Sequence, residues 1–146
     1  NDENRVIKKY KALLLGDVPS HLTKIESRLD IRRASNGHRQ ARVSETGKYA
    51  STIIEKKESY GGNTLAYLKL ETGRMHQIRA HCLHIGFPIA GDREYGSTEA
   101  NKHLRERGLS RLFLHAFYLR FRTSLCEVDI SSPLPDELKA LLTSLN

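Results

Sequence analysis

Residues 70 to 81 of the chain read Leu70-Glu71-Thr72-Gly73-Arg74-Met75-His76-Gln77-Ile78-Arg79-Ala80-His81. An alternating, strand-like run leads into this stretch, and a run with helical spacing leads out of it. Gly73 lies at the change between the two patterns, where a tight turn is needed. The ends of strands and helices are free to present side chains to a ligand. Residues 70 to 81 carry two arginines, two histidines and a glutamine. We therefore take this junction as the organising element of the fold.

Regular elements are expected on both sides of the junction. Upstream, Tyr49–Glu58 and Asn63–Glu71 have the composition of two strands, and the glycine pair between them suits a hairpin turn. Downstream, apolar residues at i, i+4 and i+7 predict a helix over His76–Ile85. Gly86 and Pro88 would end this helix.

The first third of the chain predicts strands and a basic segment. A strand is expected over residues 8–15 and a second one over Ile25–Ile31. The segment Arg32–Lys48 is basic and poor in apolar residues, which predicts a loop or a partly paired hairpin. It is either a solvated mobile segment or an arm that contacts the RNA backbone. As a functional element, it would use residues such as Arg39 and Arg42 to neutralise RNA phosphates, which needs no rigid scaffold.

The last third predicts two helices and a hairpin. A short polar helix is expected over Thr98–Arg107, and Asp136 should open a terminal helix that runs to Leu145. Leu109–Phe121 is the most apolar segment and predicts a central strand, with Cys126–Ser131 as its hairpin partner. The order of elements indicates an α+β fold, a mostly antiparallel mixed sheet with flanking helices, in one domain over residues 1–146.

Charge and cysteine content narrow the classes of function. The 146 residues include 24 Lys and Arg against 17 Asp and Glu, a formal charge of +7, which favours a polyanionic partner such as nucleic acid. No apolar run approaches the length of about 20 residues that a membrane span requires. Cys82 and Cys126 lie far apart and form no C-x-x-C motif, which predicts a reducing, cytoplasmic location.

The central junction favours an anion site over a metal site. His76 and His81 differ by five positions and would not share a helix face, and no carboxylate completes an H-E-x-x-H pattern. We therefore expect no metal. Arg74 and Arg79 flank the start of the expected helix, and arginine holds carboxylate or phosphate through two parallel hydrogen bonds. Arg79 adjoins the apolar stripe, so its buried head should need a carboxylate partner.

Three blocks of the chain resemble the RluA-type family of RNA pseudouridine synthases in order and in spacing. The family patterns are L-x-T-G-R-x-H-Q-I-R-x-H followed by G-x-P-I-x-G-D-x-x-Y-G, then K-x-Y-x-A-L, and R-L-x-L-H-A. The matching residues are 70–81 with 86–92 and Tyr95-Gly96, then Lys9 to Leu13, and Arg111 to Ala116. The resemblance covers essentially the whole chain and is greatest for RluC-type enzymes, which act on large-subunit ribosomal RNA.

The resemblance implies an activity and roles for several residues. The family isomerises uridine to pseudouridine in RNA, here ribosomal RNA, without a metal or an organic cofactor. By position, Tyr10 corresponds to the tyrosine that packs against the flipped target base. Arg79 corresponds to the arginine that pairs with the catalytic aspartate. Arg74 and His76 are expected to contact the RNA backbone, together with the basic segment.

The chain departs from the family at the catalytic aspartate. The family carries this residue in an H-R-L-D motif that precedes the K-x-Y block, but only nine residues precede Tyr10 here. Asp30 lies in a similar Ser-Arg-Leu-Asp run but follows Tyr10, so we reject it as the nucleophile, and Asp92 is taken as a structural loop residue. We thus expect a C-terminal portion of the catalytic domain that is inactive alone. The alternatives are a non-catalytic RNA-binding module and, third, a zinc hydrolase.

Overall fold

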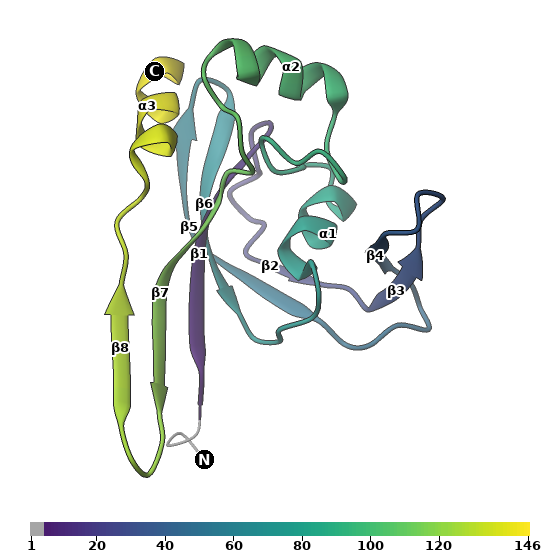
Figure 1. The fold of residues 1–146 in the computed structure, drawn as a ribbon, viewed down its shortest axis with the longest axis vertical. Coiled ribbons are helices and arrows are strands. Elements are labelled where there is room, and N and C mark those ends of the chain that lie inside the picture. The colour runs from purple at the N-terminus through teal and green to yellow at the C-terminus, as the bar shows by residue number, and fades with distance from the viewer. Residues whose placement is uncertain (1–4) are drawn as a thin grey trace.

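A computed structural model describes residues 5–146 and shows a six-stranded sheet with a small two-stranded sheet beside it (Figure 1). The strand order is β2-β5-β6-β1-β7-β8, and all the strand pairs among these residues are antiparallel. The large sheet contains β1 (Ile7–Leu14), β2 (Lys24–Glu26), β5 (Ser51–Tyr60), β6 (Asn63–Leu70), β7 (Leu114–Arg122) and β8 (Glu127–Ser131). The small sheet contains β3 (Leu29–Arg33) and β4 (Arg39–Val43).

Three helices accompany the sheets, so the expected α+β class is confirmed. They are α1 (Gln77–His84), α2 (Thr98–Glu106) and α3 (Asp136–Leu145). In Figure 1, α3 lies on the left of the large sheet and α1 on its right, between the sheet and the β3–β4 hairpin. Among residues 5–146, no helix combines the length and the apolar character needed to cross a lipid bilayer.

The predicted hairpin upstream of the junction is present. β5 and β6 pair from Thr52 with Leu70 to Tyr60 with Asn63. The two glycines of the turn have φ values of 54° and 81°. A two-residue hairpin turn requires positive φ at both central residues, and glycine adopts this conformation at no steric cost.

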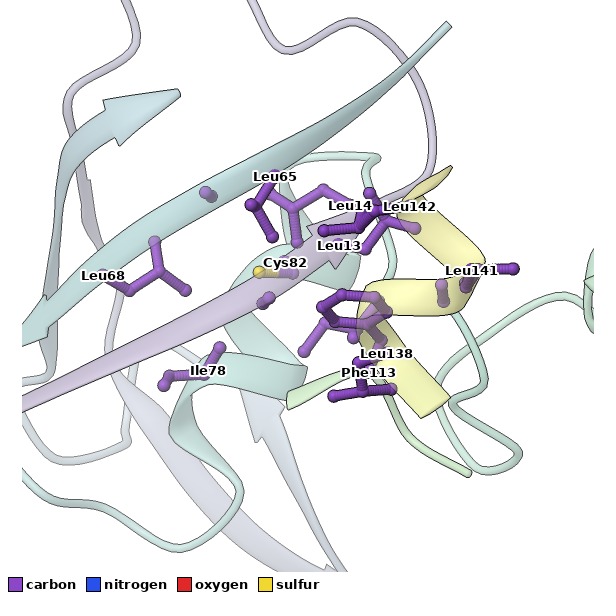
Figure 2. Close-up of a cluster of buried hydrophobic side chains, with 14 of the residues drawn as sticks. Leu13, Leu14, Leu65, Leu68, Ile78, Cys82, Phe113, Leu138, Leu141 and Leu142 are labelled. Carbon is purple, nitrogen blue, oxygen red and sulfur yellow. The ribbon is translucent and has the colours of Figure 1, made fainter. Parts of the chain in front are cut away.

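Both faces of the sheet centre are covered. Ala12, Leu13 and Leu14 are successive residues of β1, and all three are 0% exposed. Because successive strand residues point to opposite faces, this burial requires apolar cover on each side. Figure 2 shows side chains that fill this core. They include Leu65 and Leu68 of β6, Ile78 and Cys82 of α1, Phe113, and Leu138, Leu141 and Leu142 of α3.

His81 ties α1 to β5 and to the segment between β2 and β3 with hydrogen bonds at both ring nitrogens. Its side chain is fully buried. Nε2 lies 2.9 Å from the Ser27 carbonyl oxygen, which can only accept, so Nε2 carries the proton. Nδ1 then accepts from the Thr52 hydroxyl at 2.9 Å. Burial lowers the pKa of His81, because the charged imidazolium would lose its hydration.

Of two predictions for the region before the junction, one is wrong and one is confirmed. Ile25–Ile31 is not one strand, because β2 pairs with β5 while β3 pairs with β4 in the other sheet. The chain changes sheets at Ser27 and Arg28, where neither sheet ladder continues. The basic segment Arg32–Lys48 contributes to a paired hairpin, so its paired interpretation is confirmed.

The apolar segment Leu109–Phe121 is also corrected. Its strand, β7, begins only at Leu114 and lies second from the sheet edge, so it is not central. The buried residues Leu109 and Phe113 precede the strand and pack in the core as irregular chain. The short helix α2 forms as predicted, and Ser97 caps it by accepting a hydrogen bond from the Ala100 N–H.

His81 should make stability depend on pH. In the unfolded chain the imidazole titrates near its ordinary pKa of 6.5, and in the folded protein its pKa is lower. Between the two values the unfolded state binds more protons, so stability is complete above the higher value and falls as the pH drops below it. One proton changes the free energy of unfolding by at most about 1.4 kcal/mol per pH unit.

Urea unfolding at a series of pH values measures this effect. We expect His81→Gln to flatten the acid-side loss of stability, since glutamine does not titrate. The control His38→Gln changes an exposed histidine between the two hairpin strands and should keep the slope of the unaltered chain. An unchanged slope in His81→Gln would contradict the assignment.

Candidate active site

The turn that leads from β6 into α1 is held by one buried side chain, Gln77. Its Oε1 accepts from the Thr72 hydroxyl at 2.7 Å and from the Arg74 N–H at 3.1 Å. Its Nε2 donates to the Ser51 carbonyl at 2.9 Å and to Thr52 Oγ1 at 3.0 Å. Two acceptor and two donor positions of the amide are thus used, which is the full capacity of a glutamine side chain. The turn is therefore anchored to β5 at its base.

His76 takes an unusual backbone conformation at the start of α1. Its φ and ψ values are 52° and 25°, in the left-handed region, and it is the only non-glycine residue with positive φ among residues 5–146. Its side chain does not cap the helix. A non-glycine residue in this conformation costs of the order of 1 kcal/mol and points to a functional constraint. Here the conformation accompanies a bond from the ring to Tyr95.

Four residues singled out by the sequence line one pocket of about 310 Å³: Tyr10, Arg74, His76 and Arg79. Tyr10 comes from β1 in the sheet centre, and the other three come from the junction. The remaining lining is mainly apolar, with Leu70, Ile78, Leu112 and Leu114. The pocket thus combines an aromatic ring, basic groups and apolar walls, which suits an anionic ligand with a flat ring.

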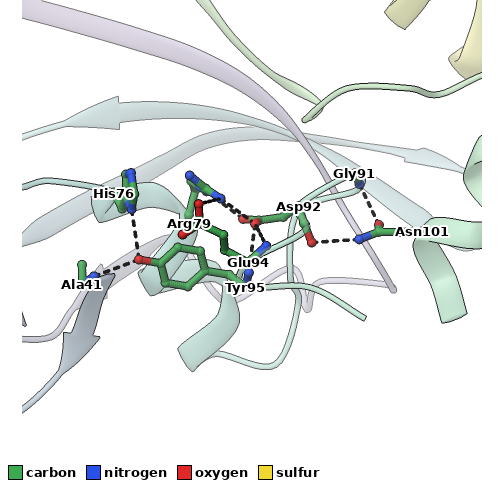
Figure 3. Close-up of polar contacts among 8 residues, drawn as sticks. All are labelled: Ala41, His76, Arg79, Gly91, Asp92, Glu94, Tyr95 and Asn101. Carbon is green, nitrogen blue, oxygen red and sulfur yellow. Dashed lines mark hydrogen bonds and ion pairs between the residues drawn. The ribbon is translucent and has the colours of Figure 1, made fainter. Parts of the chain in front are cut away.

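Arg79 binds a carboxylate of this chain, Asp92. Nε and Nη2 of Arg79 donate to the two carboxylate oxygens at 2.9 and 2.8 Å (Figure 3). The Asp92 side chain is 0% exposed and that of Arg79 is 16% exposed. This contact does not test the pairing of Arg79 with the catalytic aspartate, which stays a prediction. The expected need of a buried arginine for a carboxylate is confirmed, with Asp92 as the partner.

Asp92 also organises the loop that contains it. Its Oδ1 accepts from the N–H groups of Glu94 at 3.1 Å and Tyr95 at 2.9 Å. Asn101 of α2 donates to the Asp92 carbonyl at 2.8 Å and accepts from the Gly91 N–H at 2.9 Å (Figure 3). The carboxylate thus joins α1 to this loop, and the loop is joined in turn to α2.

The hydrogen bonds and negative charges around Arg79 favour the charged form of the arginine, and they outweigh the opposing effect of burial. The hydrogen bonds with Asp92 raise the pKa of Arg79. Its guanidinium also lies over the Tyr95 ring, 4.9 Å from the ring centre, in cation–π geometry. Burial raises the pKa of Tyr95, so its hydroxyl keeps its proton in the physiological range.

Arg74 differs from Arg79 in its partners. Its Nε donates to the Tyr49 carbonyl at 2.9 Å, which orients the guanidinium without neutralising it. Within the described part of the chain, Arg74 makes no ion pair. Arg39 and Arg42 are exposed on β4 and do not line the pocket. The structure thus separates the predicted RNA-binding residues into a pocket group and a hairpin group.

The histidines show no converging metal site. Both nitrogens of His81 already bond to Ser27 and Thr52. His76 Nδ1 bonds to Tyr95. Across residues 5–146, no three His, Cys, Asp or Glu side chains gather in a group that could hold a metal ion.

Two residues of the site were missed as functional candidates, Tyr95 and Gln77. Both fall within the family patterns, but the patterns assign them no role. The signal for Tyr95 is its position three residues after Asp92, where a carboxylate can accept the N–H of a turn. The signal for Gln77 is a polar residue beside a glycine turn, which is weak.

Comparisons with known proteins identify related sequences. The family model described as RNA pseudouridylate synthase matches residues 1–84. Ribosomal large subunit pseudouridine synthase C of Haemophilus influenzae is 40% identical over 142 residues, covering 96% of this chain and 44% of that protein. The protein of the same name from Escherichia coli (strain K12) is 39% identical over 147 residues, covering 98% of this chain and 46% of that protein. The chain therefore spans less than half the length of these relatives.

Two solved human structures have a similar fold. RNA Pseudouridylate Synthase Domain Containing 1 superposes with a TM-score of 0.69 at 30% identity, covering 94% of this chain and 59% of that one. RNA Pseudouridylate Synthase Domain Containing 4 superposes with a TM-score of 0.69 at 26% identity, covering 96% and 62%. The shared fold spans nearly all of the elements described above.

Removing the carboxylate of Asp92 should destabilise the fold. Asp92→Asn leaves a largely buried Arg79 without its counter-charge, and breaking such a pair costs about 3 kcal/mol. We expect a loss of this order in the free energy of unfolding, measured in urea. Glu94→Gln is the matched control. Its carboxylate is 34% exposed and 4.0 Å from Arg79 Nη2, so the loss should stay below about 1 kcal/mol. Equal losses in the two variants would refute the assignment.

Proposed function

This chain belongs to the RNA pseudouridylate synthase family, and from that membership we propose that the protein isomerises uridine to pseudouridine in large-subunit ribosomal RNA. The names of the bacterial relatives support this substrate. One structural observation carries the proposal. Tyr10, Arg74, His76 and Arg79 line a single pocket, although Tyr10 is more than sixty positions from the others in the sequence.

The proposed reaction exchanges one bond to the ribose for another. The N1–C1′ bond of uridine breaks, the base turns within the pocket, and a C5–C1′ bond forms; C5 loses its proton and N1 takes up one. Uridine and pseudouridine are isomers, so the reaction needs no oxidant, reductant or transferred group. Tyr10 offers an aromatic face for the base, and such stacking contributes about 1–3 kcal/mol per base. A duplex base must be flipped out to reach it, at a cost of a few kcal/mol.

Arg79 is proposed to orient the carboxylate that starts the reaction. Its Nε and Nη2 are occupied by Asp92, and Nη1 remains for a second acceptor. We place residues 1–146 in the C-terminal portion of the catalytic domain, and the catalytic aspartate outside them. This placement is supported by the absence of an H-R-L-D sequence from the chain and by the share of the relatives that the chain covers.

RNA is proposed to run from the pocket toward the β3–β4 hairpin. Arg74 carries an uncompensated charge at the pocket, and His76 lies beside it. Arg39 and Arg42 extend the positive surface along β4. Phosphate contacts of this kind set the position of an RNA without reading its bases. We propose a cytoplasmic location with this function, since ribosomal RNA is the substrate.

The role of Tyr10 can be tested by removing its ring. In the full-length protein, Tyr10→Leu should slow pseudouridine formation by about 5-fold to 150-fold, the equivalent of one lost stacking contact. Tritium release from RNA labelled at uridine C5 measures the rate. Tyr118→Leu is the control, because Tyr118 lies against Lys9, on the face of the sheet opposite to Tyr10.

The tritium assay distinguishes the role of Tyr10 in catalysis from RNA binding without catalysis. An unchanged rate in Tyr10→Leu, or an equal loss in Tyr118→Leu, would overturn the role of Tyr10. A full-length protein that binds RNA but releases no tritium would instead be a non-catalytic RNA-binding module.

The hairpin arginines can be tested in this chain alone by the salt dependence of RNA binding. Each arginine that neutralises a phosphate should contribute about 0.7–0.9 to the slope of log K against log salt. The double substitution Arg39→Ala with Arg42→Ala should reduce the slope by twice that amount. Arg105→Ala removes an exposed charge from α2 and should leave the slope unchanged. A slope unaltered by the double substitution would exclude the hairpin from the RNA path.

A further inference from the structure

Tyr95 joins three parts of the molecule that the sequence separates. It is 6% exposed, and its N–H is held by Asp92. Its ring belongs to a small core between the hairpin, the residue before β5 and α1, formed with Leu29, Ala41, Ala50 and Ala80. This core is distinct from the main one, so Tyr95 is the aromatic residue through which the hairpin rests on α1.

The hydroxyl of Tyr95 makes two hydrogen bonds of fixed direction. Its oxygen lies 2.8 Å from the Ala41 backbone nitrogen, which can only donate, so the oxygen accepts there. The hydroxyl proton must then go elsewhere, and among residues 5–146 the other partner is His76 Nδ1 at 3.1 Å (Figure 3). Tyr95 therefore donates to Nδ1.

The direction of the hydrogen bond from Tyr95 to His76 determines which ring nitrogen of His76 carries the proton. In a neutral imidazole only one nitrogen carries a proton, so an accepting Nδ1 places the proton on Nε2. His76 lines the pocket, and Nε2 has no hydrogen-bond partner in the described part of the chain. The rings of His76 and Tyr95 meet edge to face at 5.7 Å and 89°, with the backbone of His76 in the left-handed region. An N–H donor is thereby left for a ligand.

The same hydroxyl connects His76 in the pocket to the β3–β4 hairpin. Ala41 belongs to β4, the strand that carries Arg39 and Arg42. Movement of β4 shifts the N–H that holds Tyr95, and with it the donor that holds His76. Arg79, whose guanidinium lies over the Tyr95 ring, shares the same support.

We propose that Tyr95 is a positioning residue that couples the β3–β4 hairpin to the pocket, holding His76 with Nε2–H presented to an acceptor oxygen of bound RNA. The proposal rests on the proposed function only in taking RNA as the ligand of the pocket. The tautomer of His76 and its dependence on Tyr95 are properties of this chain that require no catalysis.

The first test is the ¹⁵N spectrum of the histidine rings in this chain at about pH 9, where an ordinary imidazole is neutral. His76→Gln identifies the signals of His76. We expect the Nε2–H tautomer in the unaltered chain and a mixture of tautomers in Tyr95→Phe, which keeps the ring and removes only the hydroxyl. Tyr60→Phe, which removes a hydroxyl bonded to Glu58, should leave the His76 signals unchanged. An Nδ1–H tautomer in the unaltered chain would overturn the proposal.

The second test measures catalysis by the full-length protein. Tyr95→Phe should lower kcat about 5-fold to 10-fold with little change in KM, and Tyr60→Phe should change neither. In a His76→Gln background, Tyr95→Phe should cause no further loss, because the hydroxyl acts through His76. Additive losses would show a merely structural effect and refute the coupling. An inactive full-length protein would refute the proposed function, while the spectrum would still decide the link between Tyr95 and His76.

Discussion

The paired hydrogen bonds between Arg79 and Asp92 are the contact on which the rest of the site depends. A fully buried carboxylate is stable only when donors surround it, and here Arg79 supplies two and the loop N–H groups of Glu94 and Tyr95 supply two more. These donors belong to α1 and to the loop after it, so satisfying one charge places both elements. The position of Tyr95, and through it that of the hairpin, follows from this placement.

The sequence predicts the local elements of the fold well and the choice of strand partners less well. The hairpin of β5 and β6 follows from alternation and a glycine pair, and helix α1 follows from its apolar stripe. Ile25–Ile31 has a continuous pattern, yet it divides between two sheets because pairing depends on distant strands. Leu109–Phe121 is apolar because Leu109 and Phe113 are buried as irregular chain, and composition reports burial without reporting strand pairing.

At the site, too, the sequence predicts what a residue requires but not which distant residue supplies it. Burial of Arg79 beside an apolar stripe predicts a carboxylate partner, and this physical requirement is met. The identity of the partner could not be predicted, because Asp92 is thirteen positions away across a loop whose path depends on tertiary contacts. Gln77 and Tyr95 each make some of their hydrogen bonds to backbone groups, which any residue provides, so for these bonds the sequence contains no matching partner to search for.

The two arginines of the junction therefore have different physical roles, although they look equivalent in the sequence. The charge of Arg79 is balanced at contact distance by Asp92, so it offers a directed N–H more than a net attraction for anions. Arg74 is oriented by a neutral carbonyl and keeps its full charge beside the same pocket. Attraction of a phosphate should accordingly come mainly from Arg74, while Arg79 fixes geometry. To attract a polyanion, a site needs an arginine whose charge is not balanced. To orient a second carboxylate, it needs a guanidinium that a first carboxylate holds in place. One arginine cannot meet both requirements, so such a site needs two.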